Sequence, residues 1–242
     1  MEPQRKLSEI AVRIIVLLLG LFILAQGIAF TILADLGTDA ITSPALVIHK
    51  IFGATEGGMG IEFCSVGRML IVIHCVLIFL QIVLLRRKYQ PVQLLQVVNA
   101  FILGSMVDFC TSYTTLLPEP EYTASIAYTL TGCIFCAFGI FTFVKADLVP
   151  LSAEGFCLAL HSTFKWRFSR IKVALDCAML LIAVVASLIF LGYVAGVREG
   201  SIICALSTGC IIGWLFKACP LWDKFFTALH WHTSPDPDSD SE

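Results

Sequence analysis

Charged residues are scarce in this sequence. They make up 14% of its 242 residues, whereas 58% are hydrophobic and the mean hydropathy is +0.88. A soluble domain carries about 25% charged residues, so this chain cannot cover a water-facing surface in the usual way. The net charge of −2 leaves no basic excess for binding nucleic acid. Composition therefore argues against an ordinary soluble domain and indicates a protein whose main partner is the lipid bilayer.

Enzyme signatures are missing as well. The sequence contains no Gly-x-Ser-x-Gly, no His-Glu-x-x-His and no phosphate-binding loop. Cys133 and Cys136 form a Cys-x-x-Cys pair, but no second pair or nearby histidine completes a set of metal ligands. Packing inside an apolar block is the expected role of these two thiols. We therefore expect no enzymatic activity, no metal and no cofactor.

Apolar residues fall in six blocks that are long enough to cross a bilayer, which needs roughly 20 residues each. Helix is expected in each block, because open strands leave backbone groups unsatisfied in lipid. The blocks are 11–34, 67–85, 94–117, 123–146, 171–194 and 200–218. The sequence thus predicts an all-α membrane protein with six transmembrane helices. Residues 219–242 are expected to form a cytoplasmic tail, whose acidic end lacks apolar residues and should be disordered.

The basic residues predict the orientation of these helices. With six spans, 13 of the 16 basic residues lie on the same side as the N-terminus. These are Arg5, Lys6, Arg13, Arg86, Arg87, Lys88, Lys145, Lys165, Arg167, Arg170, Lys172, Lys217 and Lys224, against Lys50, Arg68 and Arg198 on the other side. We therefore expect both termini in the cytoplasm.

Two stretches of the sequence match at a constant offset of 112 residues. Ala34-Asp35-Leu36 recurs as Ala146-Asp147-Leu148, and His49 recurs as His161. Each match opens a segment that is too short and too polar to cross, 37–53 or 150–165, and that carries an apolar stripe at helical spacing. The two stripes are Ile41, Ala45, Ile48 and Phe52, and Ala153, Cys157, Leu160 and Phe164.

Each repeat unit therefore consists of one span, a short segment and two more spans. The units are residues 1–117 and 123–218, and because each crosses three times, the second copy is predicted to be inverted relative to the first. Inverted repeats of this kind are found in many secondary transporters. The short segments 37–53 and 150–165 either enter the bilayer as re-entrant helices or lie flat on its surface, and the sequence leaves both alternatives open.

Ionisable and polar residues within or beside the spans are candidates for a transport pathway, because such groups are expensive in a bilayer. The candidates are Asp108, Asp176, His49, His161, Asn99, Asp39, Glu154, Arg68 and Lys172. Each has a structural alternative. Lys172 lies four residues before Asp176, so the two can pair along one helix face. Asp39 and Glu154 lie near predicted helix starts, where acids favour the helix dipole. The partners considered for Asp108 and Asp176 are Arg68, Lys172, Asn99 and His74.

Several of these features resemble one known family. They are Leu36-Gly37-Thr38-Asp39 before the first short segment, its second copy from Leu148 to Gly155, the basic openings of spans two and five, and Gly104-Ser-Met-Val-Asp108. This pattern is similar to the YczE/YyaS/YitT family of bacterial integral membrane proteins. The resemblance implies a multi-spanning protein of the bacterial inner membrane, without established substrate or catalytic residues.

The function expected from these observations is a small secondary transporter or permease, coupled to protons through its buried acids. Its substrate would be a small molecule or an ion. The alternatives are a non-transporting membrane scaffold or accessory protein, and a substrate-binding subunit that needs an energising partner. The sequence does not decide whether the protein forms an oligomer.

Overall fold

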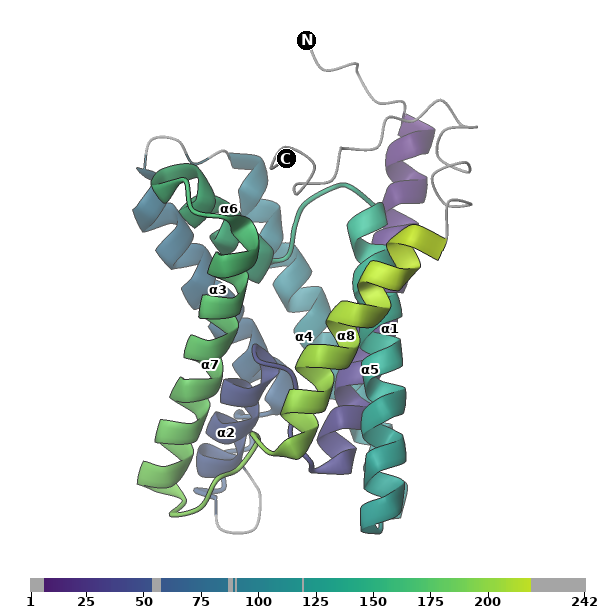
Figure 1. The fold of residues 1–242 in the computed structure, drawn as a ribbon, viewed down its shortest axis with the longest axis vertical. Helices are drawn as coiled ribbons and strands as arrows, with labels where there is room; N and C mark the ends of the chain where they lie inside the picture. The colour runs from purple at the N-terminus through teal and green to yellow at the C-terminus, as the bar shows by residue number, and fades with distance from the viewer. Residues whose placement is uncertain (1–6, 54–57, 87–88, 90, 119, 219–242) are drawn as a thin grey trace.

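The computed structural model describes residues 7–53, 58–86, 89, 91–118 and 120–218, and these residues form helices and loops without any strand (Figure 1). The helices are α1 (Leu7–Ala34), α2 (Thr42–Phe52), α3 (Val66–Leu85), the 3-10 helix η2 (Pro91–Leu94), α4 (Leu95–Thr114), α5 (Tyr122–Lys145), α6 (Ser152–Phe164), α7 (Phe168–Phe190) and α8 (Glu199–Ala218). The expectation of an all-α chain is therefore confirmed for the described residues.

Five helices are long and apolar enough to cross a membrane. They are α1 over Glu9–Ala34, α3, α4, α5 and α7, and the described apolar part of α8, Glu199–Leu215, is shorter. Large apolar side chains are exposed on the outer faces of these helices, as at Phe109, Leu181 and Ile189. In water such surfaces would drive aggregation, whereas in lipid they are solvated. The protein is therefore a multi-pass helical membrane protein.

The long helices lie side by side and alternate in direction along the chain, and the two short helices lie at opposite ends of the molecule (Figure 1). We call the end that holds α2 the α2 end, and the end that holds α6 the α6 end. The start of α1 and the end of α8 both lie at the α6 end. The first six residues of α2, Thr42 to Val47, are all buried by the protein, so this helix does not lie flat on the outer surface.

Most helix–helix contacts in one half of the chain have an equivalent contact in the other half. α1 and α5 pack along each other at the centre, α4 packs on α1, and α8 packs on α5. Each short helix contacts the long helix that follows it and also crosses to the other half, since α2 packs on α7 and α6 packs on α3. One contact breaks the pattern: α3 packs along α4, but α7 and α8 make no comparable contact within the described part of the chain.

Four glycines let the backbones of α1 and α5 approach closely, as small residues do at helix interfaces in membranes. Gly20 and Gly27 in α1 lie 112 residues before Gly132 and Gly139 in α5. A Cβ atom on Gly27 would lie 2.6 Å from the backbone nitrogen of Cys136, and one on Gly139 would lie 2.4 Å from that of Leu24. Gly20 meets Gly139 and Phe143, while Gly132 meets Gly27 and Thr31. This reciprocal pattern is the one that a two-fold axis produces.

The tightness of this interface gives a first prediction. Gly27→Leu is expected to lower the free energy of unfolding by about 2–3 kcal/mol, because the added atoms meet backbone and the helices must separate. The matched control is Gly209→Leu in α8, where an added Cβ would meet nothing within 4 Å among the described residues. Both changes raise helix propensity equally, so unfolding in mixed micelles isolates the clash. Equal stability of the two variants would contradict the prediction.

The repeated Ala-Asp-Leu sequence marks two equivalent turns. Asp35 and Asp147 both have positive φ, 47° and 46°, a conformation that aspartate tolerates better than most residues. Asp35 follows α1, and Asp147 follows α5, so each turn leads from a long helix toward a short one. The sequence match thus reflects a shared backbone conformation.

Candidate functional site

Helices α3 and α4 are in close contact near the start of α3, and we call this pair closed. A Cβ atom on Gly67 would lie 2.0 Å from the carbonyl oxygen of Gly104, so the two backbones touch there. The carboxylate of Asp108 accepts hydrogen bonds from the Ser65 hydroxyl at 2.6 Å and from the backbone N–H of Gly67 at 2.7 Å. Asp108 therefore fastens α4 to the start of α3 through Ser65 and Gly67. Arg68, a partner considered from the sequence, instead donates to the carbonyls of Glu62 and Phe63.

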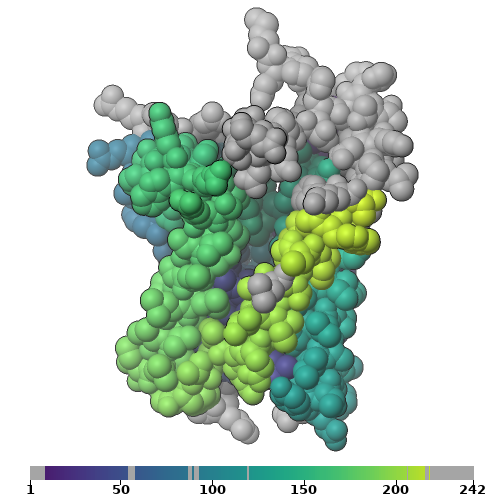
Figure 2. All heavy atoms as spheres, in the orientation of Figure 1, coloured from purple at the N-terminus to yellow at the C-terminus, as the bar shows by residue number. Residues whose placement is uncertain are grey.

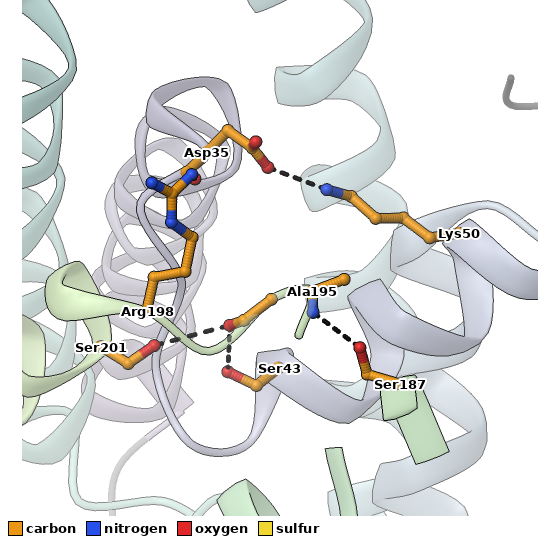
Figure 3. A network of polar contacts seen from close by, with 8 residues as sticks. Asp35, Ser43, Lys50, Ser187, Ala195, Arg198 and Ser201 are labelled. Carbon is orange, nitrogen blue, oxygen red and sulfur yellow. Dashed lines mark hydrogen bonds and ion pairs between the residues drawn. The ribbon is translucent and has the colours of Figure 1, made fainter. Parts of the chain in front are cut away.

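The loops at the α2 end join the two halves of the chain (Figure 3). The Ser43 hydroxyl donates to the carbonyl of Gly196 at 3.0 Å, and the backbone N–H of Thr38 donates to the same oxygen at 3.2 Å. Arg198 donates to the carbonyl of Asp35 at 3.2 Å. The loop before α2 is thereby tied to the loop between α7 and α8.

Asp39 lies at the start of α2, in the same loop. Its Oδ2 accepts from the backbone N–H groups of Ile41 and Thr42, both at 3.2 Å. This is the capping role that the sequence left open as an alternative. Its Oδ1 is buried and has no hydrogen-bond partner among the described residues. One oxygen of Asp39 thus holds the helix start, and the other is available to a ligand.

The first turn of α6 is surrounded by buried polar side chains. The Ser152 hydroxyl lies 2.5 Å from Nδ1 of His74 in α3, and both residues are 2% exposed. Gln96 in α4, which is 1% exposed, lies directly against Gly155, where a Cβ would meet its Nε2 at 2.5 Å. Helix α6 therefore begins inside the protein, between α3 and α4.

Lys172 and Asp176 form an ion pair on α7, with Nζ and Oδ1 3.2 Å apart. The i,i+4 pairing that the sequence predicted for them is confirmed. Glu154, in the first turn of α6, lies within electrostatic range of both residues, and Asp39 lies within range of Asp176. The two side chains of the pair are about one-third exposed, at 32% and 34%. Lys172, Asp176 and Glu154 therefore lie near one another, with Asp39 at longer range from Asp176.

Several polar atoms of this region have no hydrogen-bond partner among the described residues. They include both amide atoms of Gln96, Nδ2 of Asn99 and Oε2 of Glu154. Leaving a buried polar group unpaired costs about 1–3 kcal/mol, so such groups call for an explanation. A polar ligand or water that pairs with them supplies one. We call Gln96, Asn99, Glu154, Lys172 and Asp176 the central polar cluster.

A groove runs between α7 and α8 (Figure 2). Atoms from the N-terminal part of the chain are seen at its bottom, between the two helices. α7 and α8 diverge toward the α6 end, where α8 leans away from α7 (Figure 1). Gly209 and Gly213 lie one turn apart on α8, and an added Cβ at either position would meet nothing within 4 Å among the described residues. Gly104 and Gly213 each lie in the last long helix of their half of the chain, and Gly213 is open where Gly104 is in close contact with Gly67.

A family model matches residues 11–217 of this chain, which includes both repeat units, the central polar cluster and the α3–α4 closure. The chain belongs to DUF6198, a family of unknown function. No curated protein and no solved structure matches it. The residues of this DUF6198 protein must therefore be interpreted from its own geometry.

The structure brings four of the sequence candidates into the central polar cluster: Asn99, Glu154, Lys172 and Asp176. Asp108 and Arg68 lie instead at the closed contact of α3 and α4. His49 and His161 lie at the C-terminal ends of α2 and α6, where each places Nδ1 near a backbone carbonyl, that of Cys64 at 2.5 Å and that of Trp166 at 2.6 Å. The two histidines therefore have equivalent positions in the two halves, but they are not part of the cluster.

Two features of this DUF6198 protein were missed in the sequence. Gln96 lies three residues before Asn99, on the same face of α4, and this spacing of two amides within an apolar block was the available signal. Arg13 was counted only as a basic residue of the cytoplasmic side, but its side chain is 0% exposed and contacts Glu9 and Asp147. Nothing in its local sequence distinguishes it from a boundary residue, because Asp147 is 134 positions away.

Proposed function

We propose that this DUF6198 protein is a small secondary transporter that works by alternating access between two inverted halves. α8 is its sixth crossing, and α2 and α6 are re-entrant helices whose starts approach the central polar cluster. The proposal includes the bacterial inner membrane, the relationship to the YczE/YyaS/YitT family, and an orientation with the α6 end in the cytoplasm.

The observation that carries this proposal is the difference between two equivalent helix pairs. α3 is closed on α4 through Gly67 and Gly104, while α7 and α8 are separated by a groove. In a transporter built from inverted repeats, each half adopts the conformation of the other when the access side changes. The present arrangement then corresponds to a state open toward the α6 end. The alternative state has α7 closed on α8 and α3 parted from α4.

The buried polar groups favour transport over a scaffold. A scaffold requires only tightly packed apolar helices, and unpaired amides and carboxylates at its centre would destabilise it without benefit. In a transporter these groups are satisfied by the solute. The nearness of the partly buried Glu154 and Asp176 to Lys172 also suits proton coupling, because the charge of one group changes the proton affinity of the others.

Removal of the central acids tests the proposal. In proteoliposomes loaded with a pH-sensitive dye, we expect at least one solute from a panel of amines, amino acids, carboxylates and inorganic ions to drive proton movement. With that solute, Glu154→Gln and Asp176→Asn are each expected to reduce the rate at least about a hundredfold, the lower end of the range for a lost proton-transfer group. The control Glu62→Gln, an exposed acid, should leave the rate unchanged.

Two outcomes would contradict this reading. Normal rates in both cluster variants would remove these acids from the mechanism. Proton movement that requires a co-purifying ATPase would instead identify the chain as the substrate-binding subunit of a larger transporter.

A further inference from the structure

One surface cavity is lined entirely by residues outside the central polar cluster. Its volume is about 650 Å³, and it lies between α6 and α7 at the α6 end. Its apolar lining comes from both helices: Phe156 and Leu160 of α6, and Ile171, Ala174 and Leu175 of α7. Because α7 is a membrane-spanning helix, this apolar lining faces the layer that lipid chains occupy.

The same cavity has a basic rim. Lys165, Arg167 and Arg170 all line it, all three are exposed, and none makes an ion pair with another residue in the described ranges. Trp166, which is 62% exposed, lies among them. Tryptophan, arginine and lysine are the residues that anchor proteins at the membrane–water interface. The cavity therefore combines an apolar interior with three available cations at the depth of lipid headgroups.

The basic turn is held in a fixed conformation. Lys165 has positive φ, 55°, and its backbone N–H donates to the carbonyl of His161 at 2.8 Å. Nδ1 of His161 lies 2.6 Å from the carbonyl of Trp166, and the rings of Phe164 and Trp166 stack with centroids 5.3 Å apart. The exposed cations are thus presented by a turn with defined contacts rather than by a free chain end.

A cavity of similar size between α3 and α4 differs in charge. Its volume is about 660 Å³, but Arg68 is its only basic lining residue, and the guanidinium of Arg68 already donates to the carbonyls of Glu62 and Phe63. Apolar lining is therefore common to both cavities. The three uncommitted cations are specific to the cavity at the α6 end.

We propose that the α6–α7 cavity binds an anionic phospholipid. The phosphate of the headgroup lies among Lys165, Arg167 and Arg170, and an acyl chain follows the apolar lining along α7. Arginine binds phosphate with paired N–H donors, and basic pockets beside membrane helices are known to select anionic headgroups. This site is independent of the proposed transport function, because none of its residues belongs to the central polar cluster.

Quenching of Trp166 by brominated lipid tests the site in the full chain. The other tryptophans, Trp214, Trp222 and Trp231, are replaced by phenylalanine, so that Trp166 is the only reporter. We expect dibrominated phosphatidylglycerol to quench its fluorescence at concentrations about tenfold lower than dibrominated phosphatidylcholine. In the triple variant Lys165→Gln, Arg167→Gln and Arg170→Gln, this preference should fall to about one.

A matched variant removes three cations from the sequence that follows α3: Arg86→Gln, Arg87→Gln and Lys88→Gln. It lowers the net charge equally and should keep the preference for phosphatidylglycerol. Equal quenching by the two lipids, or an equal loss of preference in the matched variant, would overturn the proposal.

Loss of the preference in millimolar inorganic phosphate would identify a site for free phosphate instead. A preference that emerges only after deletion of residues 234–242 would identify the acidic tail as the occupant.

Discussion

Arg13→Met is expected to destabilise the protein by about 3–5 kcal/mol, the range seen when one member of a buried ion pair is removed. The Arg13 side chain is fully buried, its Nε lies 3.1 Å from the Glu9 carboxylate, and its Nη1 donates to the carbonyl of Ala146 at 3.0 Å. The same Nη1 lies 3.4 Å from the Asp147 carboxylate. Methionine fills similar volume without charge. The variant therefore leaves Glu9, which is 7% exposed, as a buried acid without this partner.

The cause of this loss can be separated from loss of packing. If the uncompensated acid dominates, the double variant Arg13→Met with Glu9→Leu should regain part of the lost stability, and Glu9→Leu alone should be milder than Arg13→Met. Unfolding in mixed micelles, followed by circular dichroism, gives the four free energies of this cycle. An exposed ion pair contributes less than about 1 kcal/mol to stability. If Arg13→Met lowers the free energy of unfolding by no more than that, the Arg13–Glu9 pair does not stabilise the fold as a buried pair would.

Arg13 also shows how the two repeated turns are secured. Its contacts with Ala146 and Asp147 fix the turn between α5 and α6 to the start of α1. In the other half, Arg198 at the start of α8 donates to the carbonyl of Asp35, and Lys50 lies 2.8 Å from the Asp35 carboxylate (Figure 3). Each turn that leads to a short helix is thus held by an arginine from a helix start. In the proposed transport cycle, these contacts would act as fixed points while the helices between them move.

The fold was predictable from the sequence as far as local pattern determines it. The blocks of apolar residues coincide with the long helices. The first two residues of each predicted stripe, Ile41 and Ala45 and likewise Ala153 and Cys157, are buried, whereas Phe164 at the end of the second stripe is exposed. The matching Asp35 and Asp147 could be found because a turn with positive φ restricts the residue at that position. The glycines at 20, 27, 132 and 139 follow the same offset of 112, but small residues recur in apolar helices by chance.

The candidate site was less predictable, because its members come from three helices, α4, α6 and α7. Asn99, Glu154, Lys172 and Asp176 could be identified as polar residues in apolar surroundings, yet no spacing indicates that α6 begins against Gln96. Asp108 was ranked beside them for the same reason, although it fastens α3 to α4. Sequence shows which residues are costly in a membrane, whereas only the packing shows which of them are already paired.

Gly213→Leu is expected to leave the present state of the protein stable and to block the alternative state. An added Cβ at Gly213 meets nothing within 4 Å among the described residues, so the present state accommodates a larger side chain there. If α7 and α8 close as α3 and α4 do, Gly213 enters a contact like that of Gly104 with Gly67. A clash of about 3 kcal/mol there would lower the closed population about a hundredfold.

This population can be measured without knowing the substrate. Spin labels at Val173 of α7 and Trp214 of α8, which are 62% and 64% exposed, report the separation of the two helices on a cysteine-depleted background. The otherwise unchanged protein should give a long and a short distance, and Gly213→Leu only the long one. Gly67→Leu should shift the balance toward the short distance, because its Cβ would lie 2.0 Å from the Gly104 carbonyl in the present state.

Gly213→Leu and Gly67→Leu are expected to shift the α7–α8 distance in opposite directions, and this distinguishes alternating access from a rigid groove. In a rigid scaffold the distance between α7 and α8 is single, Gly213→Leu changes nothing, and Gly67→Leu lowers stability without moving α8. In an inverted-repeat transporter the two substitutions act on one equilibrium from opposite sides, so their combination should partly restore both distances. A short distance that persists unchanged in Gly213→Leu would show that the open α7–α8 pair and the closed α3–α4 pair do not exchange conformations.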